Sequence, residues 1–124
     1  MIDHVTIPVA DLARSKLFYE RAFIPLGFKY SFGEEPYFHA FDIGKGLFEI
    51  AQNKNGPISS FHIALRAQSQ EQVREFYQAA MSAGAIDNGE PGPRPQYTPN
   101  YYACFVLDPD GHNIEAMFDV WNDR

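Results

Sequence analysis

The stretch His4-Val5-Thr6-Ile7 has a counterpart 58 residues later in His62-Ile63-Ala64-Leu65, which indicates an internal repeat. At the same offset Phe18-Tyr19 falls on Phe76-Tyr77. Each copy begins with alternating apolar residues, continues as an amphipathic helix and ends in short segments separated by Gly, Pro and Asp. The repeat therefore predicts two copies of one β-α-β-β-β unit.

The predicted fold class is α+β, with one domain over residues 1–124 made of a module at 1–54 and a module at 58–124. Asp11 is the expected N-cap of the first helix, and Ser69 with Gln72 forms a capping box at the second. The predicted buried helix stripes are Ala13, Leu17, Phe18 and Ala22, then Val73, Phe76, Tyr77 and Ala80. Strands are expected at 28–32, 38–43, 47–51, near Ala85, at 101–107 and at 113–119.

Composition excludes several classes of protein. Of 124 residues, 45% are hydrophobic and 21% charged, so the chain has material for a core and is not disordered. A net charge of −6 argues against a nucleic-acid partner, because phosphate binding needs a cationic surface. The sequence holds no apolar run of the ~20 residues that a membrane span needs, and Asp3 stands where a signal peptide would be basic. We therefore expect a cytoplasmic protein, and Cys104, the only cysteine, excludes an intrachain disulfide.

Two histidines and two glutamates mark a candidate metal site. Strand alternation places His4 and His62 on the face that points away from each helix, and Glu49 and Glu115 interrupt otherwise apolar strands on the same face. If the two helix-free faces meet, the four side chains form the nitrogen and oxygen donor set that first-row divalent ions prefer. The alternative is that each histidine is a hydrogen-bonded strand residue and each glutamate a surface charge.

These motifs resemble the vicinal oxygen chelate superfamily, which includes glyoxalase I, the bleomycin-resistance proteins and the extradiol dioxygenases. The resemblance rests on three stretches: His4 to Leu12 with Phe18-Tyr19, Phe61 to Leu65, and Asp108-Pro-Asp-Gly-His-Asn-Ile-Glu115. It implies paired β-α-β-β-β modules that form a cupped mixed sheet around a metal. By position, it implies that the metal ligands of glyoxalase I correspond to His4, Glu49, His62 and Glu115, whereas members with three ligands would need no Glu49.

The resemblance also bears on the substrate. Bacterial glyoxalase I has a glutathione-binding arginine four residues after the first metal histidine, where this chain has Pro8, although Asn53 matches a glutathione-binding asparagine. Arg66, four residues after His62, should lie on the helix-free face about 13 Å from it. We therefore expect a compact anionic substrate rather than the methylglyoxal-glutathione adduct; Arg66 could instead pair with a carboxylate of the protein.

Further candidate residues follow from the Asp108–Gly111 turn. With a four-residue turn, Cys104 lies opposite Glu115 and Tyr102 opposite Met117 on the cavity side, and a shift of one residue turns both away. Tyr102 is thus a candidate substrate contact or a core residue, and Cys104 is more simply a small buried hydrophobe. Residues 90–100 are expected to form a loop that presents Arg94 and Tyr97 near the cavity mouth, unless these are incidental surface residues.

Three functions are compatible with these features. The first is a lyase or isomerase with one divalent ion (nickel, zinc, cobalt, manganese or iron), in which Glu49 or Glu115 moves a proton on a small oxygen-rich substrate. The second is an iron-dependent ring-cleaving dioxygenase that uses His4, His62 and Glu115. The third is a metal-free protein that binds a drug or metabolite, as bleomycin-resistance proteins do. The resemblance implies a homodimer in each case.

Overall fold

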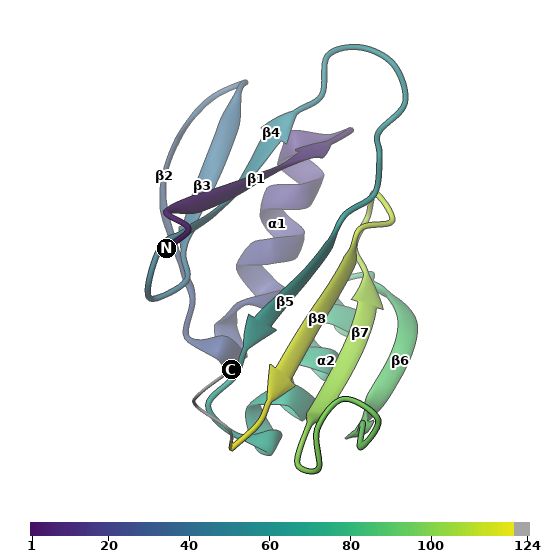
Figure 1. Cartoon of the computed structure of the whole chain (residues 1–124). Coiled ribbons are helices and arrows are strands. Elements are labelled where there is room, and N and C mark those ends of the chain that lie inside the picture. The colour runs from purple at the N-terminus through teal and green to yellow at the C-terminus, as the bar shows by residue number, and fades with distance from the viewer. Residues whose placement is uncertain (121–124) are drawn as a thin grey trace.

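The computed structural model describes residues 1–120, and both modules have the predicted order of elements (Figure 1). The last four residues of the predicted second module, 121–124, lie outside the described part. The first module contains β1 (His4–Val9), α1 (Leu12–Ala22), a short 3-10 helix η1 (Ile24–Leu26), β2 (Lys29–Glu34), β3 (Phe38–Asp42) and β4 (Leu47–Gln52). The second contains β5 (His62–Arg66), α2 (Gln70–Ser82), β6 (Ile86–Pro93), β7 (Tyr102–Leu107) and β8 (Asn113–Phe118).

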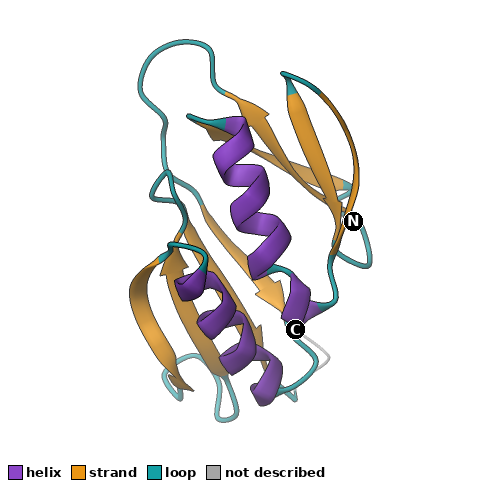
Figure 2. Ribbon diagram, turned by 180° about the vertical axis from the view of Figure 1, so that it is seen from behind, coloured by secondary structure: helices purple, strands orange, loops and turns teal. Residues whose placement is uncertain are grey.

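Each module forms its own four-stranded mixed sheet, with the orders β1-β4-β3-β2 and β5-β8-β7-β6. The strand that begins each module pairs in parallel with the strand that ends it, and the remaining pairs are antiparallel. Seen from behind, α1 and α2 both lie in front of the sheets, so they cover the same side of the molecule (Figure 2). The predicted α+β fold of two β-α-β-β-β modules is confirmed, and neither α1 nor α2 covers the opposite faces of the sheets.

The helix caps are confirmed, and Phe18 and Ala22 of the predicted α1 stripe are buried, but Ala13 and Leu17 are exposed. Asp11 accepts a hydrogen bond from the Arg14 amide, and Ser69 accepts one from the Gln72 amide. In α1 the buried residues are Leu12, Ser15, Phe18, Tyr19 and Ala22. The predicted Leu17 is 49% exposed. The prediction was wrong because it counted only apolar residues, whereas Ser15 and the Tyr19 hydroxyl are buried with hydrogen-bond partners from the second module.

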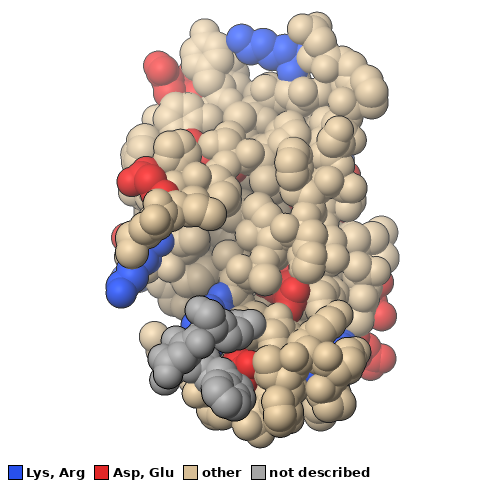
Figure 3. Space-filling view, in the orientation of Figure 1, with Lys and Arg blue, Asp and Glu red and all other residues tan. Residues whose placement is uncertain are grey.

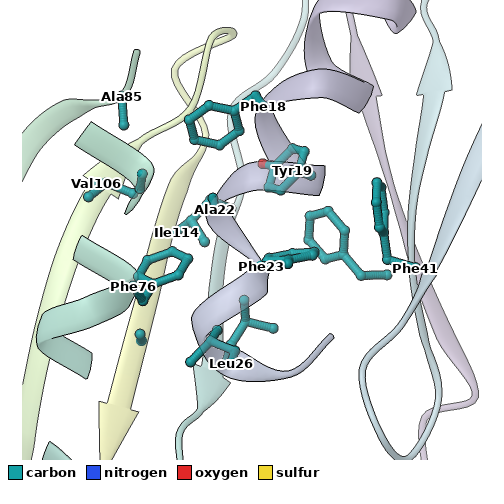
Figure 4. Close-up of a cluster of buried hydrophobic side chains, with 14 of the residues drawn as sticks. Phe18, Tyr19, Ala22, Phe23, Leu26, Phe41, Phe76, Ala85, Val106 and Ile114 are labelled. Atoms are coloured by element: carbon teal, nitrogen blue, oxygen red, sulfur yellow. The ribbon is translucent and has the colours of Figure 1, made fainter. Parts of the chain in front are cut away.

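One cluster of buried side chains runs through both modules. It includes an aromatic group in which the Tyr19 ring lies 5.1 Å from Phe23 and 4.9 Å from Phe48. The cluster continues from α1 and η1 to α2 and the second sheet. Figure 4 draws part of it, with Phe18, Ala22 and Leu26 from the first module and Phe76, Val106 and Ile114 from the second. Burial of this shared surface holds the two modules together side by side.

The turn at residues 108–112, here called the inter-module latch, fixes the second module on the first. The buried Asp108 carboxylate accepts hydrogen bonds from the Tyr19 hydroxyl at 2.5 Å and from the amides of Asp110 and His112, each at 2.9 Å. Burial and the neighbouring Asp108 carboxylate raise the pKa of Tyr19 well above its ordinary value, so this hydroxyl stays a donor. Asp110 accepts from the amide of Ala10 at 2.9 Å.

His112 completes the latch. Its Nε2–H donates to the Pro8 carbonyl at 2.7 Å, and its Nδ1 accepts from the Phe61 amide at 3.0 Å. Because Pro8 belongs to β1 and Phe61 directly precedes β5, one buried ring ties together the two strands that carry His4 and His62. The latch thus sets the relative position of the two histidine strands.

Residues 90–93 were expected in a loop and instead extend β6, which pairs with β7 up to Pro93 opposite Tyr102. The register shifts at Gly89, whose φ of 152° suits glycine, and a Cβ there would lie 2.9 Å from the Phe105 ring. Proline is tolerated because β6 is an edge strand. Within residues 1–120, neither helix has the length and apolar character needed to cross a membrane.

Candidate metal centre

Each histidine strand lies beside a glutamate strand in the same register. Thr6 of β1 is opposite Glu49 of β4, and Ala64 of β5 is opposite Glu115 of β8. Each histidine stands two residues before Thr6 or Ala64 and therefore shares the helix-free face with the glutamate. The repeat seen in the sequence thus produces two equivalent His–Glu pairs on the two open faces.

The pair in the second module is in direct contact. The Nε2–H of His62 donates to Oε1 of Glu115 at 2.8 Å. The Tyr101 hydroxyl donates to the other oxygen, Oε2, at 2.5 Å. The Glu115 side chain is 4% exposed, whereas that of His62 is 53% exposed. A buried carboxylate therefore stands behind an accessible imidazole, with both of its oxygens bonded.

The pair in the first module is more open. Glu49 accepts one hydrogen bond, from the Thr6 hydroxyl at 3.1 Å. The Nδ1–H of His4 donates to the Asp3 carboxylate at 2.8 Å, an arrangement that leaves Nε2 available for coordination. The hydrogen bond that His4 donates to Asp3, and after it the negative charge of Glu49, raise the pKa of His4 above its ordinary value. His4 and Glu49 thus influence each other electrostatically across the face.

The two pairs do not converge within one chain. Among residues 1–120, no three His, Cys, Asp or Glu side chains are grouped closely enough to hold a metal ion. The helices pack together behind the sheets, and the two helix-free faces lie open side by side (Figures 1 and 2). The space-filling view of this open side shows few charged side chains, and they are scattered (Figure 3).

The predicted register of the β7–β8 hairpin was wrong by one residue. Cys104 lies opposite Ala116 and Tyr102 opposite Phe118, because His112 belongs to the latch and the turn has five residues instead of four. Tyr102 therefore points to α2, where its hydroxyl accepts from Arg74 at 3.2 Å. Tyr102 lies on the α2 side of its sheet, away from His62 and Glu115, and is not the predicted substrate contact.

The same shift places Cys104 in the core, where its thiol donates to the Val73 carbonyl at 3.6 Å. Burial raises the pKa of the Cys104 thiol to about 12. At pH 8 the thiolate fraction is then about one in ten thousand. We expect an aromatic disulfide reagent to label no cysteine in the native protein and one per chain in guanidinium chloride. Stoichiometric labelling of the folded protein within minutes would contradict this placement.

Arg94 and Tyr97 each contact an aromatic residue, Phe105 or Tyr101, that itself contacts the second pair. The guanidinium of Arg94 lies 5.5 Å from the centre of the Phe105 ring, which is itself 6.0 Å from the His62 ring. Arg94 also donates to the Glu90 carbonyl at 2.9 Å. The Tyr97 ring packs edge-on against Tyr101 at 5.1 Å. Contact of Arg94 or Tyr97 with a substrate remains a prediction.

Asn53 and Arg66 have partners within the protein. The Asn53 amide donates to the carbonyls of Asn55 and Gly56 in the connection between the modules. Arg66 donates a hydrogen bond to the backbone carbonyl of Asp119 at 3.0 Å. It lines an open cavity of about 760 Å³ between the β3–β4 turn and the ends of β5 and β8, and Lys45 lines the opposite side.

Four residues near these features escaped the sequence reasoning: Asp3, Lys45, Tyr101 and Phe105. Alternation in the strand at 101–107 contains the signal for Tyr101 and Phe105, but the turn length assigned them to the wrong face. Asp3 and Lys45 flank strands and leave no periodic signal.

Comparison with known proteins identifies the family. The sequence profile of the Glyoxalase/Bleomycin resistance protein/Dioxygenase superfamily matches residues 1–116. A glyoxalase/bleomycin resistance protein from Albidiferax ferrireducens T118 is 29% identical, with a TM-score of 0.85, over 96% of this chain and 99% of that one. A lactoylglutathione lyase from Agrobacterium tumefaciens is 15% identical, with a TM-score of 0.76, over 100% and 98% of the two chains.

TioX from Micromonospora sp. ML1 is 16% identical, with a TM-score of 0.74, over 95% of this chain and 98% of that one. At this identity, TioX and the lyase show a shared fold alone. No curated protein matches the chain. The match of the family profile over nearly the whole sequence is decisive, and the chain belongs to the Glyoxalase/Bleomycin resistance protein/Dioxygenase superfamily.

Proposed function

We propose that this protein is a metal-dependent lyase or isomerase that acts on a small substrate bound through two neighbouring oxygens. The observation that carries the proposal is the repeated register of the His–Glu pairs, Thr6 opposite Glu49 and Ala64 opposite Glu115. Two unrelated surface pairs would have no reason to occupy equivalent positions on two open faces.

The residues present fit a divalent ion. Two imidazole nitrogens and two carboxylates suit nickel, zinc, cobalt, manganese or iron(II). Glu115 is 3% exposed, and a bound cation would offset the cost of burying its charge. Asp3 holds His4 by Nδ1, which is the orientation that carboxylates give to metal-binding histidines. His4, Glu49, His62 and Glu115 are the residues that would hold the ion.

We propose that the complete centre forms in a homodimer. Because the four residues do not converge within residues 1–120 of one chain, His4 and Glu49 of one copy would meet His62 and Glu115 of a second copy. A two-fold dimer repeats this contact and gives two equivalent centres. The open helix-free faces support such an arrangement, since each presents half of the donor set.

The chemistry follows from the donor set. A divalent ion held there would act as a Lewis acid that lowers the energy of negative charge on a substrate oxygen. Glu49 or Glu115 would take a proton from one substrate carbon and return it to the adjacent carbon. Phe105, packed against the His62 ring, would keep water from that side of the centre.

The test of this function is metal content together with oligomeric state. Protein purified without a histidine tag and loaded separately with each of the five metals is expected to retain about one ion per chain, and light scattering is expected to give the mass of two chains. A monomer that retains none of the five metals would refute the proposal.

We propose that the substrate carries an anionic group at the end that lies away from the metal. Arg66 and Lys45 line one cavity, Pro8 replaces the arginine that holds glutathione, and the Asn53 amide is bonded to the connection between the modules. We expect the methylglyoxal-glutathione hemithioacetal to be turned over weakly or not at all in the nickel and cobalt forms. Efficient turnover that is unchanged in Arg66→Ala would contradict the anionic assignment.

A second candidate is a metal-free binding protein. Phe32 and Phe38 lie on the helix-free face of the first module, where their rings pack edge-on at 5.7 Å and Phe32 is exposed. Exposed aromatic side chains on an open face suit a planar ligand. The metal-loading test separates the candidates, because a binding protein of this kind stays metal-free.

A further inference from the structure

We infer that Tyr101 is a positioning residue for Glu115: its hydroxyl holds Oε2 and thereby presents Oε1, beside His62, as the coordinating oxygen. This inference rests on the proposed metal site. It adds a residue that lies outside the four expected ligands and that the sequence reasoning did not identify.

Contacts of Tyr101 and of the neighbouring 94–101 loop restrict the position of its side chain. Its carbonyl accepts from the Arg94 amide at 2.7 Å, which closes the 94–101 loop. The Thr98 hydroxyl ties the same loop to the Asp119 carboxylate at 2.6 Å. The Tyr97 ring packs edge-on against the Tyr101 ring, which is buried. The Tyr101 hydroxyl therefore belongs to a buried side chain whose loop is held by hydrogen bonds and ring packing.

The two modules hold their carboxylates by different means. In the first, the hydroxyl of Thr6 on β1 donates to Glu49. The equivalent position in the second module is Ala64, which has no hydroxyl. Tyr101 supplies the missing donor from the other side, next to β7, and its bond to Glu115 at 2.5 Å is shorter than the Thr6 bond at 3.1 Å.

The consequence is an ordered ligand. A carboxylate with one oxygen bonded to protein has fewer orientations to lose when the other oxygen binds a metal. It is also kept from coordinating through both oxygens. Without the Tyr101 hydroxyl, Oε2 of the buried Glu115 would lose this hydrogen-bond donor. The orientation of the Glu115 carboxylate would then be less restricted.

The test compares two neighbouring tyrosines on opposite faces. Tyr101→Phe removes the hydroxyl and keeps the ring, and Tyr102→Phe makes the same change on the face that points to α2. We expect calorimetry to show cobalt(II) binding weakened by about 10- to 100-fold in Tyr101→Phe and by less than about twofold in Tyr102→Phe. We also expect the visible spectrum of bound cobalt to change only in Tyr101→Phe, because the coordination by Glu115 changes.

Equal affinity and equal spectra in wild type and Tyr101→Phe would overturn the inference while leaving the proposed function intact. Equal losses in Tyr101→Phe and Tyr102→Phe would also overturn it, since the effect would then come from general packing. Wild-type protein that binds no metal would overturn the inference and the proposed function together.

Discussion

The His4→Ala/His62→Ala variant is expected to bind divalent metal at least about a hundredfold more weakly than the wild type, because it removes both nitrogen donors of the proposed centre. The side chains of His4 and His62 are 48% and 53% exposed, so their removal should leave the fold intact. Calorimetric titration with zinc or cobalt(II) measures the metal affinity, and a thermal unfolding curve of the same samples shows whether the fold is retained.

His39→Gln is the control for a histidine outside the centre. His39 is buried, accepts from the Tyr30 hydroxyl at 2.9 Å and donates to Glu35 at 3.0 Å. This variant is expected to lower the free energy of unfolding and to keep the metal affinity within about twofold of the wild-type value. Metal binding by the double variant equal to that of wild type would exclude His4 and His62 as ligands.

Asp108→Ala is expected to lower the free energy of unfolding by about 3 to 5 kcal/mol. The variant leaves the Tyr19 hydroxyl and the amides of Asp110 and His112 without their acceptor inside the latch. Each buried unsatisfied donor carries a desolvation cost. The variant also removes the hydrogen bond between Tyr19 of α1 and the second module, which weakens the contact between the two modules. Urea unfolding followed by circular dichroism measures the change.

Asp42→Ala is the matched control, because Asp42 stands at the end of β3 beside a turn and accepts an amide hydrogen bond, from Gly44 at 2.8 Å, but is exposed. Its expected cost is below about 1 kcal/mol. Similar losses in the two variants would show that the latch contributes no more than an ordinary surface turn.

The order of the elements was predictable because it depends on local patterns repeated twice. The caps at Asp11 and Ser69 and the alternation around His4 and His62 involve neighbours in sequence, and they agree with the structure. The 58-residue offset shows that these local patterns occur twice. The placement of the four candidate ligands on helix-free faces follows from the same alternation.

The features that sequence reasoning missed depend on contacts between distant segments. The β7–β8 register shifted because His112 bonds to Pro8, 104 residues earlier. The buried face of α1 includes Ser15 because Asp110 lies beside it. For the same reason Tyr101 could not be linked to Glu115 before the register was known.

A mixing experiment determines whether the proposed metal centre is shared between two copies of the chain. One variant, His4→Ala/Glu49→Ala, destroys the donor pair of the first module, and the other, His62→Ala/Glu115→Ala, destroys that of the second. Neither variant alone should bind zinc tightly. After the two are unfolded together and refolded, half of the dimers contain one chain of each kind, and each mixed dimer has one intact centre if its ligands come from both chains.

The predicted result is tight binding of about a quarter of a zinc ion per chain in the refolded mixture, measured by calorimetry and confirmed by metal analysis after gel filtration. Dimers that exchange chains but still bind no zinc would contradict the account, because the two halves of the centre would then not meet across the dimer.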